Sequence, residues 1–269
     1  MTAWNVRSTL LETLKNSGTI LKESIRQKKV IAHKGELNLV TETDKRSEEQ
    51  IVRTILSRFP DHAILTEESP ARGRSPYRWI IDPLDGTTNF VHSYPVACVS
   101  IAFEDHGIMV LGGVYDPFRD ELFFAEKGQG ATLNDEPMVV SQNPRLADSL
   151  LGTGFPYDRR QYADEYLAIF KAFLMKVQGN RRTGAAALDL SYVACGRFDG
   201  FWELKLHLWD IAAAYLIIEE AGGRLSDFSG RPLNLSKLET EVVPQTVASN
   251  GFIHEEMIET LKPFVGVGR

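Results

Sequence analysis

The sequence lacks most of the features that mark secreted, membrane-bound or zinc–thiolate proteins. Its 269 residues include two cysteines, Cys98 and Cys195, which are too far apart for Cys-x-x-Cys spacing and argue against a disulfide framework or a thiolate zinc site. The longest apolar runs, around Ile80 and Ile211, fall well short of the roughly 18 residues of a membrane span. The N-terminus has no signal-peptide pattern. We therefore expect a soluble, cytoplasmic protein with no membrane contact.

Basic charge and sequence repetition are also scarce. The net charge is −6 and there is no basic run, which argues against nucleic acid as the main partner. No period of about 20 to 50 residues repeats, which argues against a solenoid. The chain has no Gly-x-Ser-x-Gly elbow, no Gly-x-x-x-x-Gly-Lys phosphate loop and no His-Glu-x-x-His zinc motif. Acidic residues are left as the candidates for cation chemistry.

Apolar residues make up 43% of the chain, enough for a substantial core, and their spacing changes along the sequence. Helical spacing predicts helices over residues 6–25 and 51–59. Segments rich in β-branched and aromatic residues predict strands, namely AILT (63–66), WIID (79–82), VACVSIAF (96–103), IMVLGGVY (108–115) and ELFFAE (121–126). Turn signals between the last three predict an antiparallel meander.

Helical patterns return in the second half of the chain, over residues 162–177, 185–195 and 210–221, and two glycines then supply a stop. The chain thus divides into an N-terminal α+β half, residues 1–145, and a C-terminal α/β half, residues 146–269. No Pro- or Gly-rich linker separates them. We expect one compact unit, with most metal ligands on the first half and the functional site in the cleft that the second half completes.

The segment WIIDPLDGTTNF, residues 79–90, places two aspartates at the end of an apolar strand. We expect Asp82 and Asp85 in a tight, Pro-containing turn, where two close carboxylates repel each other unless a cation neutralises them. A hard divalent metal ion suits such a pair, and the backbone carbonyl of Leu84 could add another oxygen ligand. The alternative is that both aspartates are ordinary turn and helix-cap residues.

Backbone amides follow these aspartates directly. The N–H groups of Gly86, Thr87 and Thr88, at the start of a short helix, would form a nest for an anionic oxygen, so that metal and phosphate could meet here. Two further acids strengthen the metal hypothesis: Glu67, in the segment TEES, and Asp210, which we expect to open the helix WDIAAAYLIIEEAGG. A solvated loop and a helix cap are the simpler explanations for these two residues.

Four segments together resemble the inositol monophosphatase family of magnesium-dependent, lithium-sensitive phosphomonoesterases. They are EES, WIIDPLDGTTNFVH, GAAALDLSYVACGRFDGFWE and LHLWDIAAAYLIIEEAGG, and the resemblance runs from LVTETD to AGGRLSD. It implies an α+β or α/β fold, a layered α-β-α-β-α sandwich of the inositol monophosphatase and fructose-1,6-bisphosphatase type. It also implies a homodimer, because relatives commonly form one.

The resemblance assigns metal ligands and a catalytic group. Two or three Mg²⁺ ions would bind, the first to Glu67, Asp82 and the Leu84 carbonyl, the second to Asp82, Asp85 and Asp210, and a weaker third to Glu67 and water. Asp44, in LVTETD, would accept a hydrogen bond from Thr87, and with Glu67 this group would activate the attacking water. The alternative for Asp44 is a helix cap. Hydrolysis would be direct, without a phosphoenzyme.

The resemblance also assigns a substrate side. The amides of Gly86 and Thr87, with Thr88, would hold the phosphate. Gly184, Ala185 and Ala186 would line the sugar side, Glu203 would bind polyol hydroxyls, and His207 would lie near the substrate. Alternatively, His207 is a strand-to-helix connector that touches no ligand. Glu203 could instead pair with Lys205 or cap the helix at Asp210.

A phosphate ester of a small polyol or sugar, most of all inositol 1-phosphate, is the substrate that Glu203 favours. Phosphatases of fructose 1,6-bisphosphate, histidinol phosphate and nucleotide 3′-phosphates are similar at this level. A phosphatase-like regulatory binding protein is an alternative from another class, although the presence of all four acidic ligands favours an enzyme.

The chain departs from the family pattern in one loop. Asn38 stands where some relatives have aspartate, and either His33 or Lys34 takes a lysine position. Metal affinity at the third site is the property that this departure affects.

Overall fold

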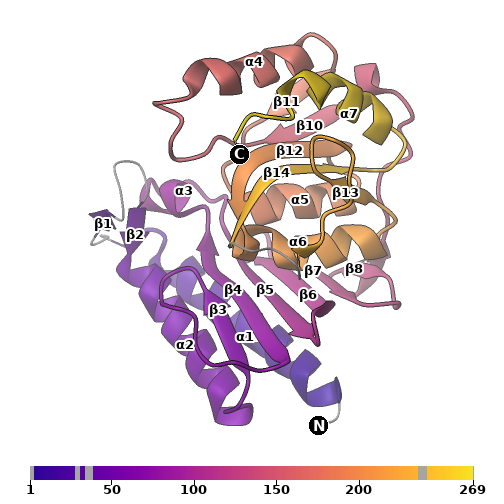
Figure 1. Cartoon of the computed structure of the whole chain (residues 1–269). Helices are drawn as coiled ribbons and strands as arrows, with labels where there is room; N and C mark the ends of the chain where they lie inside the picture. The colour runs from indigo at the N-terminus through magenta and orange to yellow at the C-terminus, as the bar shows by residue number, and fades with distance from the viewer. Residues whose placement is uncertain (1–2, 28–30, 34–38, 236–240, 269) are drawn as a thin grey trace.

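The computed structural model describes residues 3–27, 31–33, 39–235 and 241–268, which form five stacked layers (Figure 1). From one outer face to the other these are helices α1 and α2, a seven-stranded sheet, helices α5 and α6, a five-stranded sheet, and helices α4 and α7. The predicted α-β-α-β-α sandwich is confirmed. Lys34, Asn38 and the side chain of His33 lie outside the described residues, so the structure does not test the loop whose sequence departs from the family pattern.

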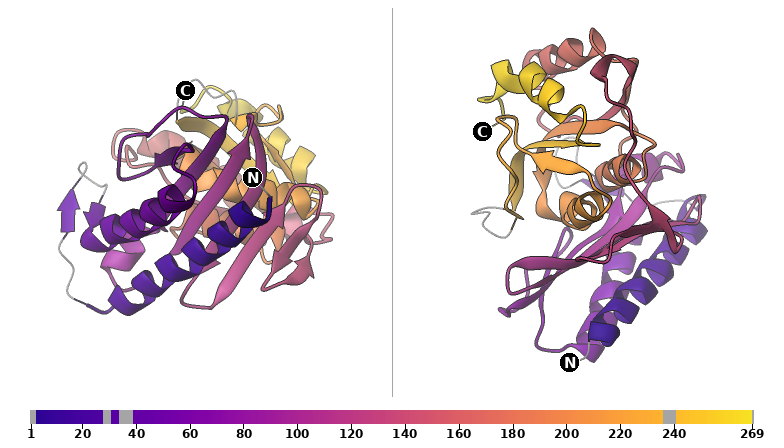
Figure 2. Two further views of the ribbon diagram at one scale, coloured as in Figure 1. Left: turned by 90° about the horizontal axis from the view of Figure 1, so that it is seen from below. Right: turned by 90° about the vertical axis from the view of Figure 1, so that its right-hand side faces the viewer.

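Two amphipathic helices, α1 (Ala3–Ser24) and α2 (Glu42–Arg58), form the first layer and lie side by side across the sheet (Figure 2). The side chains of Leu10, Leu14 and Leu21 recur at helical spacing and are fully buried, which is why α1 packs on this face. Short antiparallel strands β1 (Ile31–His33) and β2 (Leu39–Thr41) precede α2. The expected helices at 6–25 and 51–59 are confirmed, the second starting earlier than expected.

The seven-stranded sheet carries the predicted meander. Its strands, in spatial order, are β3 (Ala63–Thr66), β4 (Tyr77–Asp85), β5 (Cys98–Asp105), β6 (Ile108–Asp116), β7 (Glu121–Glu126), β8 (Ala131–Leu133) and β9 (Glu136–Met138). β3 runs parallel to β4, and every later neighbour is antiparallel. The five predicted strands are therefore confirmed. In this order β4, which carries both aspartates, pairs with the edge strand β3.

Helices α5 (Ala186–Ala194) and α6 (Leu208–Glu220) lie between the two sheets (Figure 2). They are apolar on nearly all sides because both faces are covered. Gly112 lets α6 come close, since a Cβ there would lie 2.5 Å from the carbonyl oxygen of Ala213. Gly113 points to the other face, where a Cβ would lie 2.5 Å from Cδ1 of Leu14. Two adjacent glycines thus admit a helix on each face of the sheet.

The five-stranded sheet is mixed, with the order β11-β10-β12-β14-β13. Its strands are β10 (Leu150–Thr153), β11 (Gly179–Arg181), β12 (Gly200–His207), β13 (Arg224–Ser226) and β14 (Val242–Ser249). Helices α4 (Ala163–Leu174) and α7 (His254–Leu261) cover its outer face, with a buried cluster that includes Phe173, Trp202 and Met257. The predicted helices in this half are confirmed, although α4 ends earlier than residue 177.

Along the chain, all strands of the seven-stranded sheet come before residue 145 and all strands of the five-stranded sheet come after it. One buried hydrophobic cluster joins α5 and α6 to side chains of both sheets, such as Ile80 and Phe201. The division into two halves stays a prediction. Among the described helices, none combines the length and the hydrophobicity needed to cross a lipid bilayer.

Candidate active site

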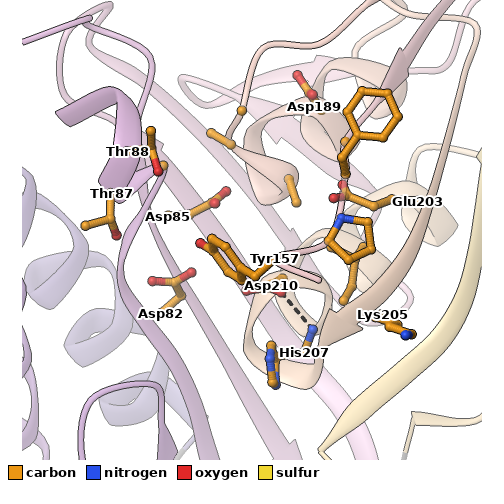
Figure 3. Close-up of a pocket in the computed structure, with 18 of the residues that line it drawn as sticks. Asp82, Asp85, Thr87, Thr88, Tyr157, Asp189, Glu203, Lys205, His207 and Asp210 are labelled. Carbon is orange, nitrogen blue, oxygen red and sulfur yellow. Dashed lines mark hydrogen bonds between the residues drawn. The ribbon is translucent and has the colours of Figure 1, made fainter. Parts of the chain in front are cut away.

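A cavity of about 380 Å³ is lined by residues of both sheets, such as Asp82 of β4 and Glu203 of β12. Figure 3 shows Asp82, Asp85, Thr87 and Thr88 on one side of it, and Glu203, His207, Asp210 and Asp189 on the other. The predicted site residues that line it are Glu67, Asp82, Leu84, Asp85, Gly86, Thr87, Thr88, Gly184, Ala185, Ala186, Glu203, His207 and Asp210. Asp44 is absent from the lining and lies behind Thr87. Residues from segments far apart in the sequence thus face one space.

Asp82 and Asp85 belong to strand β4, and the prediction of a separate turn after the strand is wrong. Asp82 lies opposite Ser100 and Asp85 opposite Cys98, so β4 has one more residue than β5 over this stretch. This β-bulge accommodates Pro83, which has no N–H to donate to a regular ladder. The bulge brings both aspartates to the cavity from a single strand, where regular alternation would place residues three apart on opposite faces.

Hydrogen bonds to backbone amides fix the two carboxylates. Oδ1 of Asp82 accepts the N–H of Leu84 at 3.0 Å. Oδ2 of Asp85 accepts the N–H of Ala187, at the start of α5, at 2.7 Å. Asp85 therefore links the first sheet to a helix of the second half, and the floor of the cavity is held from both sides.

The buried acids raise one another's pKa. Burial raises the pKa of Asp82 well above its usual range, and the charges of Glu67, Asp85 and Asp210 add to this. Burial also raises the pKa of Asp85, to about 6, although the amides of Ala187 and Ala186 partly offset it. Negative charges thus converge here, and the charged groups acting on these carboxylates are mainly each other. Such an arrangement favours protonation or a bound cation.

Asp210 does not open helix α6 as predicted. The helix begins at Leu208, with His207 as its N-cap, and Oδ2 of Asp210 accepts the N–H of His207 at 2.7 Å. Burial, with the charges of Asp85 and Glu67, raises the pKa of Asp210. The imidazole of His207 stacks on Trp209, with ring centroids 4.6 Å apart. His207 is thus a strand-to-helix connector that also lines the cavity.

Asp44 caps helix α2 and also accepts the predicted hydrogen bond from Thr87, whereas its part in activating water stays a prediction. Its Oδ2 accepts the N–H of Thr41 at 2.9 Å and the Thr41 hydroxyl at 2.5 Å, which caps helix α2. Its Oδ1 accepts the hydroxyl of Thr87 at 3.1 Å. Burial raises the pKa of Asp44, although these hydrogen bonds oppose the effect. The carboxylate therefore ties α2 to the hydroxyl of Thr87 at the cavity wall.

The loop that carries Glu67 is anchored by a buried residue that the sequence analysis did not single out, Glu48 of α2. Its carboxylate accepts the hydroxyl of Thr66 at 2.6 Å, the N–H of Glu68 at 2.9 Å and the hydroxyl of Ser69. The sequence signal was available, because Glu48 shares the buried helical face of Ile51 and Ile55. A buried acid on an apolar face needs such partners.

Glu203 lies in β12 and is 8% exposed at the cavity wall. Burial raises its pKa to about 8; Asp189 and Asp85 add to this effect and Arg182 opposes it. The alternative pairing with Lys205 is wrong, since Nζ of Lys205 bonds Oδ2 of Asp158 at 2.5 Å. The alternative of a helix cap is also wrong, because Asp210 fills that role.

Comparison with known proteins decides the family. The sequence profile of the inositol monophosphatase family matches residues 4–263. The chain belongs to this family. It is 49% identical to the inositol-1-monophosphatase of Synechocystis sp. over an aligned stretch of 226 residues, and this stretch covers 83% of this chain and 77% of that protein. It is also 41% identical over 261 residues to Nus factor SuhB of Pseudomonas aeruginosa, covering 94% of each. The solved inositol monophosphatase of Anabaena (Nostoc) sp. superposes with a TM-score of 0.86 at 39% identity, covering 98% of this chain and 97% of that one.

In this family member, several lining residues were missed by the sequence analysis. Among them are Gly154 and Tyr157, in the segment after β10, and Arg182 and Asp189, around the start of α5. Tyr157 is 49% exposed, and Figure 3 shows its ring beside Asp85 and Asp210; burial of the phenol, with the charges of Glu67 and Asp210, raises its pKa. The signal for Arg182 was the pair of arginines directly before Thr183 and Gly184. Tyr157 had no sequence signal, because a loop position carries no periodicity.

The acidic cluster is not a preformed metal cage. Within the ranges that the structure describes, no group of three or more His, Cys, Asp or Glu side chains is arranged to hold a metal ion. Asp82, Asp85 and Asp210 share a cavity and raise one another's pKa. A role in metal binding is therefore a proposal from chemistry.

Proposed function

We propose that the protein is a Mg²⁺-dependent phosphomonoesterase that hydrolyses a small polyol or sugar phosphate, with inositol 1-phosphate as the best candidate, to the alcohol and inorganic phosphate. One observation carries the proposal: Asp82 and Asp85 face Asp210 across a single cavity, and the side of the cavity that carries Asp210 also carries a further carboxylate, Glu203 (Figure 3). The aspartates suit cations, which would in turn attract a phosphate, and Glu203 suits hydroxyl groups. Membership of the inositol monophosphatase family supports the same assignment.

The donor set fits Mg²⁺ by its chemistry. The side chains of Asp82, Asp85 and Asp210 offer hard oxygen donors, as Mg²⁺ prefers, and burial, together with the repulsion between these acids, raises their pKa values. A bound cation would relieve this repulsion. We propose that Glu67, Asp82, the carbonyl of Leu84, Asp85 and Asp210 hold two or three ions.

Residues of the chain would position the reactants around these ions. When bound, Mg²⁺ would supply positive charge to activate water and to stabilise the leaving oxygen. The hydroxyl of Thr87 donates to Asp44, so its oxygen lone pairs can accept a hydrogen bond from the attacking water. We propose Glu67 as its partner in orienting this water. The amides of Gly86 and Thr87, with Thr88, would hold the phosphate oxygens.

The substrate half of the cavity favours a hydroxylated alcohol. Gly184, Ala185 and Ala186 leave room there, and the carboxylate of Glu203 would accept hydrogen bonds from hydroxyl groups. His207 lines the same side beside Asp210. Fructose 1,6-bisphosphate, histidinol phosphate and a nucleotide 3′-phosphate are the alternative substrates against which this proposal is set.

Phosphate release tests the proposal directly. Purified protein would be assayed on equal concentrations of these esters, with Mg²⁺, with EDTA, and with Mg²⁺ plus millimolar LiCl. We expect Mg²⁺-dependent release that is fastest from inositol 1-phosphate and slowed by lithium, which can occupy an oxygen cage without supplying a divalent charge. Release from none of the esters, or equal release in EDTA, would contradict the enzyme assignment.

A second role is favoured by one comparison, because a relative that covers nearly all of this chain is named Nus factor SuhB. We propose a regulatory binding role as the second candidate, compatible with hydrolysis. A strain lacking the gene, complemented with Asp82→Asn protein at normal abundance, separates the two. Restoration of the wild-type phenotype by this variant would assign the physiological role to binding, whereas failure would assign it to hydrolysis.

The oligomer is a further proposal. Large apolar side chains on and beside α4, among them Leu167, Leu174 and Met175, are more than half exposed in the single chain. Such a surface suits contact with another chain. We propose a homodimer, for which light scattering should give twice the 30.2 kDa of one chain. The cytoplasmic location expected from the sequence also stays a prediction.

A further inference from the structure

The segment after β10 places one side chain, Tyr157, inside the cavity. Figure 3 shows its ring between Asp85 and Asp210, with the hydroxyl end toward Asp85, and all three residues line the same space. Within the described part of the chain, this hydroxyl makes no hydrogen bond to another residue. A tyrosine hydroxyl is neutral near pH 7 and has one proton to donate. The cavity therefore contains a donor that is available to a ligand.

Contacts on either side of Tyr157 fix its segment to helix α4. The ring of Phe155 packs against Phe170, with ring centroids 6.0 Å apart. Oδ1 of Asp158 accepts a hydrogen bond from the hydroxyl of Tyr166 at 2.7 Å. Phe170 and Tyr166 both belong to α4. The backbone at Tyr157 is therefore held by an apolar contact before it and a polar contact after it.

Lys205 of β12 fixes the same segment from the cavity wall. Its Nζ donates to Oδ2 of Asp158 at 2.5 Å, and it also lies 4.8 Å from the centroid of the Tyr162 ring. β12 also carries Glu203, which lines the cavity. The ion pair thus connects the residue next to Tyr157 with a strand of the cavity wall.

The backbone of Lys205 is unusual for a residue inside a strand. Its φ is 56°, in the left-handed region that side chains other than glycine rarely adopt. Regular alternation would turn Lys205 to the same side as Glu203, whereas Figure 3 shows it pointing away from Glu203. Such strain persists where surrounding contacts compensate for it, and it gathers at functional sites. A partly exposed ion pair adds little stability, so the pair with Asp158 suits a role in positioning.

We propose that Tyr157 donates a hydrogen bond to the phosphate group of the ester, and that Lys205 and Asp158 are positioning residues that hold it there. The inference rests on the proposed function. The amides of Gly86 and Thr87 would hold the phosphate from the side of β4, and Tyr157 approaches it from the second half. Because this contact is made to the phosphate, its loss should affect esters of different alcohols alike.

Removal of the hydroxyl tests the contact itself. Tyr157→Phe would be assayed with saturating Mg²⁺ on inositol 1-phosphate and on p-nitrophenyl phosphate, and inorganic phosphate would be titrated into the Mg²⁺-saturated protein by calorimetry. We expect kcat/KM to fall about tenfold on both esters, mainly through KM, and the Kd of phosphate to rise about as much. Tyr94→Phe, at an exposed tyrosine outside the cavity lining, is the matched control and should keep all three values.

Lys205→Gly tests the positioning, because it separates stability from binding. Glycine adopts a positive φ without strain, and the lost ion pair is partly exposed, so the Tm should be unchanged or higher. The KM of both esters and the Kd of phosphate should nevertheless rise about three- to tenfold, and adding Tyr157→Phe should change them by less than about twofold beyond Tyr157→Phe alone. Asp158→Asn breaks the same pair without a change in β12 and should repeat the rise.

Other outcomes would overturn the inference. A loss in Tyr157→Phe that is confined to inositol 1-phosphate would assign the hydroxyl to the alcohol, and unchanged values would remove it from the phosphate. A rise in KM for Lys205→Gly but not for Asp158→Asn would show that the effect does not pass through the ion pair. A lower Tm with a matching loss of kcat would assign Lys205 to folding. Wild-type protein that releases no phosphate from either ester would refute the proposed function, while the titration with inorganic phosphate still tests Tyr157.

Discussion

Single carboxylates in this protein serve the fold and the candidate site at once. Oδ2 of Asp210 caps a helix, Oδ2 of Asp85 holds the start of α5, and Oδ2 of Asp44 caps α2. From sequence, a cap and a functional acid are competing explanations. A carboxylate has two oxygens with several lone pairs, so a structural bond on one does not exclude a role for the other.

Asp82 is the residue on which the proposed chemistry depends most, because it is buried and surrounded by the other acids. Asp82→Asn keeps the shape and removes the charge. We expect kcat for phosphate release to fall at least about a hundredfold, with a higher Mg²⁺ requirement. The exposed Asp148→Asn is the matched control. If Asp82→Asn keeps the wild-type kcat and the wild-type Mg²⁺ dependence, Asp82 has no role in the proposed chemistry.

Glu203 separates recognition from chemistry. Burial raises the pKa of Glu203 to about 8, so the carboxylate is mainly charged in an assay at about pH 9. Losing a charged hydrogen-bond acceptor weakens binding by about 1.5 to 3 kcal/mol, so at this pH Glu203→Gln should lower kcat/KM for inositol 1-phosphate about ten- to a hundredfold. An aryl phosphate should lose much less. Kinetics measured side by side on the two esters decide whether Glu203 recognises the substrate's hydroxyl groups or serves general structure. An equal loss on both esters would leave the polyol preference without support.

At the scale of helices and strands, periodicity and turn signals were sufficient for most elements. The strands at 63–66 and 121–126 have the predicted bounds. Two features of these elements were not predicted from the sequence. The bulge in β4 depends on its pairing with β5, which is not visible from β4 alone. The start of α6 at Leu208 was missed because Asp210 looks like an N-cap when it is the third helical residue, bonding backwards.

Helix α7 is joined to the second sheet through a buried histidine. Nδ1 of His254 lies 2.8 Å from the hydroxyl of Ser249, and Nε2 lies 2.9 Å from that of Ser226. The Ser226 hydroxyl also donates to the carbonyl of Asp227, which leaves its oxygen to accept from Nε2–H. The neutral ring therefore satisfies both serines, and burial, with the charge of Arg224, lowers the pKa of His254 to about 4.

This histidine should make the fold sensitive to mild acid. The unfolded chain binds a proton near pH 6.5 and the folded chain only near pH 4, so the stabilisation is complete above pH 6.5 and is lost as pH falls toward 4. The loss between pH 7.5 and 5 is about 2 kcal/mol. Urea unfolding at both pH values should show a smaller drop in His254→Asn than in wild type. Equal drops in the two proteins would show that His254 does not titrate this way.

The adjacent glycines of β6 give a prediction about helix packing. In Gly112→Ala the new Cβ meets the backbone of α6, which cannot rotate away, whereas in Gly113→Ala it meets the ends of Leu14 and Leu10, which can. We expect the first variant to lose about 2 to 3 kcal/mol of unfolding free energy and the second about 1 kcal/mol. Urea titrations measure both. The reverse order would mean that α6 can shift on the sheet more easily than α1 side chains can rotate.

For the whole molecule, the resemblance to the family predicted the layers, whereas the sequence did not predict the interior of the cavity. Motifs and the family resemblance identified residues such as Asp82, Glu203 and Asp210, which lie on strands and a helix. Tyr157 and Gly154 follow a strand end, and their approach to the acids depends on how the second sheet packs against the first. The spacing between the acids depends on the same packing, and no single segment encodes it.

The proposed cation site has a consequence for global stability, because its ligands come from both halves. Asp82 and Asp85 belong to the first sheet and Asp210 to a helix of the second half, and the acids raise one another's pKa across the cavity. A cation that binds them in the folded state alone adds about 2.7 kcal/mol at a hundred times its Kd. At this chain length that corresponds to a rise in Tm of about 5 to 10 °C.

Thermal unfolding with increasing MgCl₂, against NaCl at equal ionic strength, measures this effect without any assay of activity. The NaCl series removes the general screening of a chain with a net charge of −6. We expect Mg²⁺ to raise the Tm of wild type in a concentration-dependent way, and Asp82→Asn and Asp210→Asn each to lose most of the rise. Each variant removes a ligand from a different half, so equal losses would show that the ion joins them. If NaCl raises the Tm as much as MgCl₂, or if only Asp82→Asn loses the rise, the shared site is wrong and the cation binds one half alone or not at all.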